Sequence, residues 1–198
     1  MISTEEIDAA GTYVEHLRQA IHDRSVPNTK RVRAAGSCLA AAQEHHHAIV
    51  RLIDAHLYAS AFALLRSAFE AYVRGEWLAL CATDEFVERF LNGKEPPKIK
   101  VLLSALEVTP SFEEHVLSNI KALSWNAMCA HAHTGGLHVQ RWNTIEGIEP
   151  NFSREEVLEV MRFAEVIATL ATVGIVRLIQ DDELAMKILD AFKTRMSQ

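Results

Sequence analysis

The sequence is poor in the residues that would argue against a helical protein. Its 198 residues include only 8 glycines and 5 prolines, which excludes collagen-like and low-complexity chains. Aromatic residues make up 7% of the chain, hydrophobic residues 49% and charged residues 23%, so the chain is too apolar for intrinsic disorder. Alanine is frequent, and this composition favours helices over strands. The length fits one domain, which we place at residues 1–198.

Basic residues, cysteines and long apolar runs are also scarce. The formal net charge is −6, so a global basic surface for nucleic acid is absent and any phosphate site must be local. Cys38, Cys81 and Cys129 lack the spacing of a metal site or a disulfide framework. The most apolar run, residues 166–176, is shorter than the ~20 residues of a membrane span. Since the first residues also lack a secretory signal, we expect a cytoplasmic protein with no membrane contact and no cofactor.

Capping residues and apolar periodicity divide the chain into predicted helices. Ser3 with Glu6 and Ser153 with Glu156 match the capping box that starts a helix, and Asn28 is expected to cap the second helix. Residues 137–152 have no helical period and are predicted to form one long loop. We therefore predict an all-α fold, a single bundle of about seven to eight helices. The predicted helices cover about residues 4–23, 28–55, 57–82, 83–92, 96–107, 111–133, 153–180 and 181–196.

The third predicted helix is apolar nearly all round, yet it carries one stripe of charge. Arg66, Glu70 and Arg74 are four residues apart and therefore share one helix face. Two interpretations stay open: a structural salt-bridge network, or an arginine pair preset by Glu70 to hold a phosphate or carboxylate. A neighbouring stripe of small residues would let another helix approach closely, which favours a homodimer: Ser67, Ala71 and Gly75.

The second predicted helix carries three consecutive histidines. They are roughly 100° apart around the helix, so they cannot share one metal ion. His46 lies on the apolar stripe and is expected to be buried. Glu44 and His47 form one Glu-x-x-His pair, whereas helical di-iron proteins use two. We predict no metal site, and a metal-binding hydrolase that combines this pair with Glu70 is kept as an alternative.

The sixth predicted helix ends with His131 and His133. The negative end of the helix dipole stabilises a charged imidazole there, so we expect both histidines to be charged near neutral pH. They are roughly 200° apart around the helix, so they face different ways. Glycines 135 and 136 follow and permit close approach of another chain or a ligand.

Two segments together resemble a known group of proteins. The first is the run from Ala130 to Gly136, with His131 and the sequence His-Thr-Gly-Gly, followed by Arg141. The second is residues 64–72, with the sequence Arg-Ser-Ala-Phe-Glu. They resemble an uncharacterised bacterial all-helical family with an Arg-x-x-x-Glu helix and a His-x-Gly-Gly helix end. That family is distantly similar to the HEPN superfamily, whose members include ribonuclease toxins and phage-defence proteins. The resemblance covers about residues 35–175.

The resemblance implies a site at the end of the sixth helix. HEPN ribonucleases place an arginine, four to six intervening residues and then a histidine on one helix, usually across a homodimer. His131 would be that histidine, but positions 124–126 hold no arginine, and Asn126 would match the polar residue that often follows it. An arginine of the third helix would then supply the missing cation. The resemblance thus implies His131 and Asn126 as catalytic residues. The binding residues would be Arg66, Glu70, Arg74, His133 and Arg141.

Three functions follow from these observations. The first is an HEPN-like bundle that binds RNA or a nucleotide phosphate in a ribonuclease-type or defence-related role; it predicts that Arg66, Arg74, His131 and Arg141 converge. The second is a non-enzymatic dimeric interaction module, in which the polar residues satisfy one another. The third is the metal-binding bundle hydrolase. A homodimer is expected in the first two, and the sequence leaves open whether the protein is an enzyme.

Overall fold

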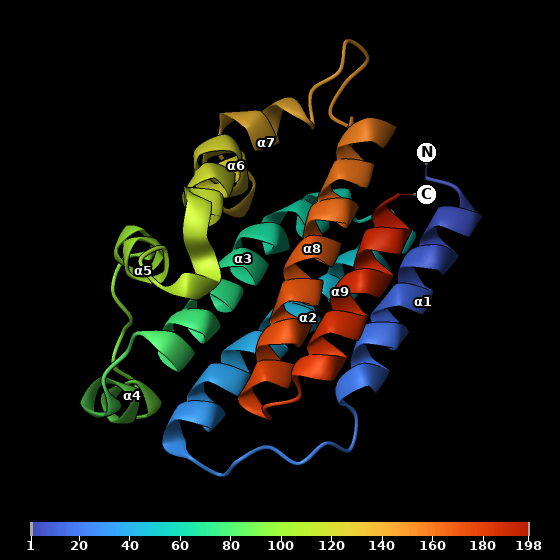
Figure 1. The fold of residues 1–198 in the computed structure, drawn as a ribbon. Coiled ribbons are helices and arrows are strands. Elements are labelled where there is room, and N and C mark those ends of the chain that lie inside the picture. Colours follow the sequence, from blue (N-terminus) through green and yellow to red (C-terminus); the bar gives the residue numbers. More distant parts are fainter. Residues whose placement is uncertain (1, 198) are drawn as a thin grey trace.

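The computed structural model describes residues 2–197, without the side chains of residues 113 and 114; residues 1 and 198 of the predicted domain lie outside it. Over this range the chain forms nine α-helices and one short 3-10 helix, which confirms the predicted all-α bundle. Figure 1 shows the long helices side by side, with the first and last helices adjacent. The long helices are α1 (Thr4–Ile21), α2 (Lys30–Asp54), α3 (Tyr58–Leu80), α8 (Arg154–Leu178) and α9 (Asp182–Met196).

The shorter helices pack on the outside of the long ones, with α4 against α2. Helices α5 and α6 both pack on α3, and α7 packs on α6. After α7 the chain turns in a small hairpin, bridged between Asn143 and Ile148, before it enters α8. In the described part of the chain, no helix combines the length and the apolar character needed to cross a membrane. These shorter elements are α4 (Asp84–Leu91), α5 (Ile99–Leu106), η1 (Pro110–His115), α6 (Val116–Ala132) and α7 (Gly136–Gln140).

A single leucine marks the point where the three central helices meet. Leu39 of α2 is fully buried between Gly75 of α3 and Gly174 of α8. A Cβ added at Gly75 would lie 2.6 Å from Leu39 Cγ, and one at Gly174 would lie 3.0 Å from Leu39 Cδ1. Gly75 belongs to the small-residue stripe that favoured a homodimer. In the structure it lets α2 approach α3 within the same chain, so this part of the stripe is not available to a second copy. The homodimer itself stays a prediction.

Local capping explains where several helices begin. Both predicted capping boxes form, since the Ser3 and Ser153 hydroxyls each accept from the backbone N–H three residues on, at 3.2 Å. The predicted cap at Asn28 is wrong by one residue. The hydroxyl of Thr29 accepts from the Val32 N–H at 3.2 Å and starts α2. A short side chain one position later reaches the exposed N–H group equally well.

The predicted helix over residues 111–133 is divided in the structure. Its first turn is the 3-10 helix η1, and α6 starts only after His115, which adopts a left-handed conformation with φ of 56°. The Glu107 carboxylate accepts from the Ser118 N–H and hydroxyl, both at 2.6 Å, and so satisfies the start of α6. The predicted loop 137–152 is also shorter than expected. Helix α7 occupies its beginning, and five residues are too few to produce a detectable period.

Candidate functional site

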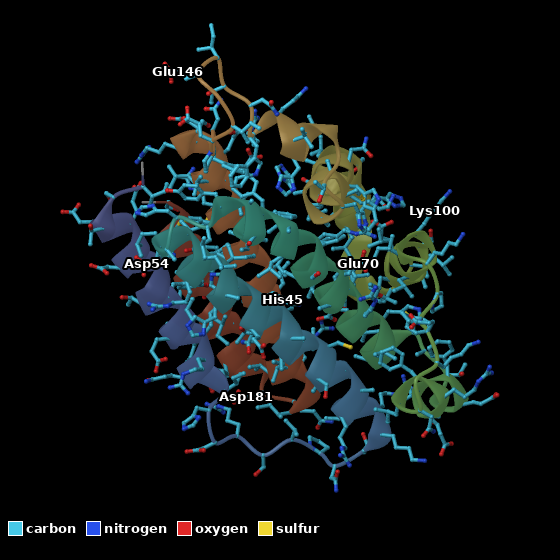
Figure 2. All side chains as sticks on the ribbon, turned by 180° about the vertical axis from the view of Figure 1, so that it is seen from behind. His45, Asp54, Glu70, Lys100, Glu146 and Asp181 are labelled. Atoms are coloured by element: carbon cyan, nitrogen blue, oxygen red, sulfur yellow. The ribbon has the colours of Figure 1, made fainter. Side chains whose placement is uncertain are left out.

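The charged stripe of α3 forms two ion pairs around one carboxylate. Arg66 Nε donates to Glu70 Oε1 at 2.8 Å, and Arg74 Nη2 donates to Glu70 Oε2. The Glu70 side chain is 14% exposed, whereas those of Arg66 and Arg74 are 24% and 36% exposed. One largely buried carboxylate therefore holds two arginines that both reach solvent, and the group carries a net positive charge. Figure 2 shows Glu70 on α3, on the same side of the molecule as Lys100 of α5.

Helix α6 adds an aromatic ring and a third cation to this group. The Arg66 guanidinium carbon lies 4.9 Å from the centroid of the Trp125 ring, and Lys121 Nζ lies 5.4 Å from it. Cations within about 6 Å of an indole face are attracted by the ring's quadrupole. Arg66 is thus fixed from two directions, by Glu70 and by Trp125. We call this surface the cationic flank of α6: Arg66, Glu70, Arg74, Lys121, Trp125 and His133.

His133 completes the cationic flank through Arg66. The Nη1 group of Arg66 contacts His133 Nε2. This contact places the ring of His133 beside the guanidinium of Arg66, at the end of α6. The charge of His133 near neutral pH stays a prediction.

His131 lies on the opposite flank of α6, in aromatic surroundings. Its ring centroid is 4.9 Å from that of Phe62, 5.4 Å from His138 and 6.4 Å from Phe152. Burial lowers the pKa of His131, and His138 and Arg141 lower it further. The expectation of a charged His131 is thus wrong, since desolvation outweighs the helix dipole. Its Nδ1 atom is buried and has no hydrogen-bond partner among the described residues.

The predicted site residues therefore form two groups instead of one. Arg66, Arg74 and His133 meet on the cationic flank, whereas Arg141 pairs with Glu156 beside His131. The expected convergence of all four predicted cations on one site does not occur within the chain. Asn126, the other predicted catalytic residue, is exposed. The catalytic roles of His131 and Asn126 stay predictions.

A groove runs along the flank of α6 that carries His131. It encloses about 550 Å³ between α6 and α8, with α3 as its floor. Its walls are mostly apolar, and charged side chains of α8 stand at its edge. We call this surface the groove flank of α6. The lining residues are Phe62, Leu65, Leu123, Ser124, Ala127, Met128, His131, Glu155, Glu156, Leu158, Glu159, Val160, Arg162, Phe163 and Val166.

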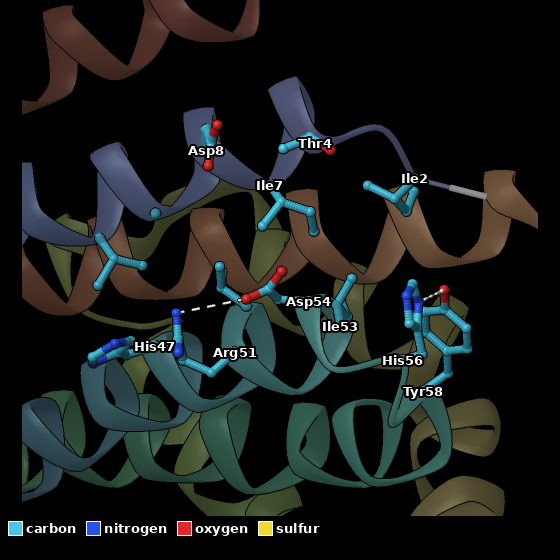
Figure 3. A pocket seen from close by; sticks show the side chains of 13 residues that line it. Ile2, Thr4, Ile7, Asp8, His47, Arg51, Ile53, Asp54, His56 and Tyr58 are labelled. Carbon is cyan, nitrogen blue, oxygen red and sulfur yellow. Dashed lines mark hydrogen bonds and ion pairs between the residues drawn. The ribbon is translucent and has the colours of Figure 1, made fainter.

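The residues of the metal-site alternative do not come together. His47 lines a cavity of about 460 Å³ between α1 and α2, shown in Figure 3. Glu70 instead lines a separate cavity that α2 shares with α3. In the part of the chain that the structure describes, no group of three metal-ligating side chains forms. Two pairs of polar groups lie in the Figure 3 cavity: Arg51 with Asp54 at 3.6 Å, and His56 Nδ1 with the Tyr58 hydroxyl at 2.9 Å.

Several polar groups lie in the bundle core. His46 is 1% exposed, as its place on the apolar stripe predicted, and burial lowers its pKa to about 4. Glu165 is 4% exposed and accepts from Arg195 Nε at 3.0 Å and Nη2 at 2.7 Å. Glu76 is 3% exposed, and burial raises its pKa to about 7. Sequence reasoning missed these two glutamates, although both interrupt strongly apolar helices and were detectable on that ground.

Comparison with known proteins gives one match. The model of a family described as a family of unknown function (DUF6988) matches residues 39–197. This span includes the residues of both flanks of α6. The family match agrees with the resemblance to an uncharacterised family, without the finer similarity to HEPN proteins. No curated protein and no solved structure matches the chain.

Proposed function

The chain belongs to the DUF6988 family, whose function is unknown, and we propose that it binds the phosphate groups of RNA or of a nucleotide on the cationic flank of α6. One observation carries the proposal: Arg66 is held at the same time by Glu70 and by the ring of Trp125. An arginine fixed in this way loses little conformational entropy when it binds an anion. In a protein with a net charge of −6, such a local excess of cations has a specific use.

The cationic flank has hydrogen-bond donors to offer a phosphate. Arg66 uses Nε for Glu70 and Nη1 for His133, and Arg74 uses Nη2 for Glu70. Three guanidinium nitrogens donate no hydrogen bond to another described residue: Arg66 Nη2, Arg74 Nε and Arg74 Nη1. Guanidinium groups match the geometry of phosphate oxygens and bind them bidentately. Lys121 adds a further charge next to Trp125, an aromatic residue of the kind that stacks with bases in RNA-binding proteins.

The similarity to HEPN proteins supports RNA as the ligand. Cleavage of RNA by His131 and Asn126 remains a separate prediction, because His131 lies on the groove flank, where burial lowers its pKa. Binding on the cationic flank does not depend on it. The alternative of a non-enzymatic interaction module is developed below, on the other flank.

Binding is tested by titrating the protein with a labelled single-stranded RNA, a nucleoside triphosphate and inorganic phosphate, each at low and high salt. We expect Arg66→Ala to weaken binding by about tenfold to a hundredfold, since a hydrogen bond to a charged group contributes about 1.5–3 kcal/mol. Arg33→Ala is the matched control, because Arg33 is an exposed arginine that lines a cavity between α2 and α8.

The three ligands separate the sources of the phosphate. Tight binding of RNA alone would identify a nucleic-acid site, whereas equal binding of triphosphate and RNA would identify a nucleotide site. Equal affinities in wild type, Arg66→Ala and Arg33→Ala would contradict the proposal. Incubation of the RNA followed by a denaturing gel, with His131→Ala in parallel, tests the predicted cleavage independently of binding.

A further inference from the structure

The groove flank of α6 exposes apolar surface that no described residue covers. Leu123 is 86% exposed at the edge of the groove, and Ala127 is exposed one turn further along α6. The floor below them is formed by buried or half-buried side chains, Phe62, Leu65 and Phe163. A single exposed leucine is ordinary, but a leucine that protrudes beside a hollow of about 550 Å³ provides both parts of a knob-and-hole contact.

The edge of the groove also carries both signs of charge. Glu155, Glu159 and Arg162 are exposed and lie on one stripe of α8, at spacings of four and three residues. None of the three makes an ion pair with another described residue. Their neighbours do: Arg154 pairs with Glu6 at 2.6 Å, and Glu156 pairs with Arg141. Three of the charged residues that border the groove therefore have no ion pair among the described residues.

We propose that the groove flank binds the groove flank of a second copy of this chain, in a homodimer with twofold symmetry. Leu123 of each copy enters the hollow of the other, and Arg162 of each copy faces Glu155 and Glu159 of the other. A twofold interface uses the same patch on both subunits, so the patch must be complementary to itself. This one is, because it holds a protruding apolar residue beside a hollow, and acidic residues beside an arginine.

Other occupants fit the groove less well. A basic peptide would match the two glutamates but would leave Arg162 facing a like charge. A small apolar ligand would fill the hollow and leave Leu123 in water. A second copy satisfies the apolar and the charged features together. The proposal is independent of phosphate binding, which uses the other flank of α6.

The dimer is tested by measuring the molar mass of the full chain by light scattering and sedimentation over a range of concentrations. We expect wild type to be a dimer at micromolar concentration. Leu123→Glu, Arg162→Glu and Glu159→Arg should each raise the dissociation constant at least tenfold. Combining Arg162→Glu with Glu159→Arg in one chain should restore part of the lost affinity, because positions 159 and 162 of opposite copies again carry opposite charges while Glu155 still repels the carboxylate at position 162. Arg33→Glu is the control reversal on a remote exposed arginine.

Circular dichroism of each variant shows that it is folded, and all the changed residues are exposed, so we expect little loss of stability. A wild-type monomer at high micromolar concentration would overturn the proposal. A dimer that survives Leu123→Glu and both single charge reversals would also overturn it, because the interface would then lie elsewhere. Arg66→Ala should remain a dimer, so failure of phosphate binding and failure of dimer formation are distinguishable.

Discussion

The two flanks of α6 differ in chemistry although a single helix of 17 residues separates them. On the cationic flank, polar side chains from α3 and α6 contact one another and remain open to solvent. On the groove flank, Phe62, Phe152 and Met128 surround His131 and exclude water from much of its ring. His131 and His133 are only two residues apart, but His133 contacts Arg66, whereas His131 is desolvated among aromatic rings.

The comparison separates what holds α6 in place from what α6 presents to a partner. Apolar burial beneath the groove flank attaches the helix to α3, with free energies of several kcal/mol for each large side chain. Partly exposed ion pairs on the cationic flank add little to stability. They fix the positions of charges that a ligand would meet. The following predictions test this division of roles.

The largest effect is expected on stability from the groove flank. Phe62→Ala removes a ring that is 6% exposed and packs against both His131 and Phe152. We expect a loss of about 3–5 kcal/mol in the free energy of unfolding, measured by urea denaturation. Trp125→Ala on the cationic flank should lose less, about 1–2 kcal/mol, because the indole is half-buried and its partners are cations. Equal losses would show that both flanks hold α6 equally.

Glu70→Gln should reduce both stability and phosphate binding. It weakens the hydrogen bonds to Arg66 and Arg74, and we expect a loss of about 1–2 kcal/mol in the free energy of unfolding, below that of a fully buried pair because both arginines reach solvent. It also loosens Arg66, which Glu70 holds in place, so we expect RNA affinity to fall about three- to tenfold. Melting curves and RNA titration check the two effects. Tighter binding by Glu70→Gln would contradict the proposal that Glu70 presets the arginines.

The pH dependence of stability should report the buried histidine of the groove flank. The pKa of His131 is lowered in the folded state, so below about pH 6.5 the unfolded chain binds more protons than the folded one. The stabilising contribution is complete above that pH and is lost as the pH falls through the folded pKa. His131→Gln should therefore lose less stability than wild type between about pH 7.5 and about pH 5.5. Identical pH dependence in the two proteins would contradict the desolvated position of His131.

The smallest effect is expected for the outermost cation of the cationic flank. Lys121 contributes one charge next to Trp125, at 5.4 Å from the ring. Lys121→Ala should weaken RNA binding only about two- to threefold. It should also reduce the slope of log affinity against log salt by about 0.7, the value for one phosphate contact on a single strand. An unchanged slope would place Lys121 outside the bound RNA.

Sequence reasoning succeeded where the governing interactions are local. Capping boxes fix the starts of α1 and α8, and the four-residue spacing of the α3 stripe accounts for its two ion pairs. The burial of His46 follows from apolar periodicity on α2. The left-handed residue His115 and the five-residue helix α7 were missed, because each depends on contacts specific to one turn, such as His138 Nδ1 with the His131 carbonyl.

The sequence by itself determined the long helices, the capping boxes that start α1 and α8, and the buried face of α2, since these depend on residues within four or five positions of one another. Only the tertiary structure decided which of the two histidines at the end of α6 meets Arg66, because that depends on how α6 crosses α3. It also decided that Gly75 faces Leu39 within the chain, and that Arg195 pairs with Glu165 thirty residues away. Helix crossings are set by the sum of many packing contacts, and no local pattern in the chain records that sum.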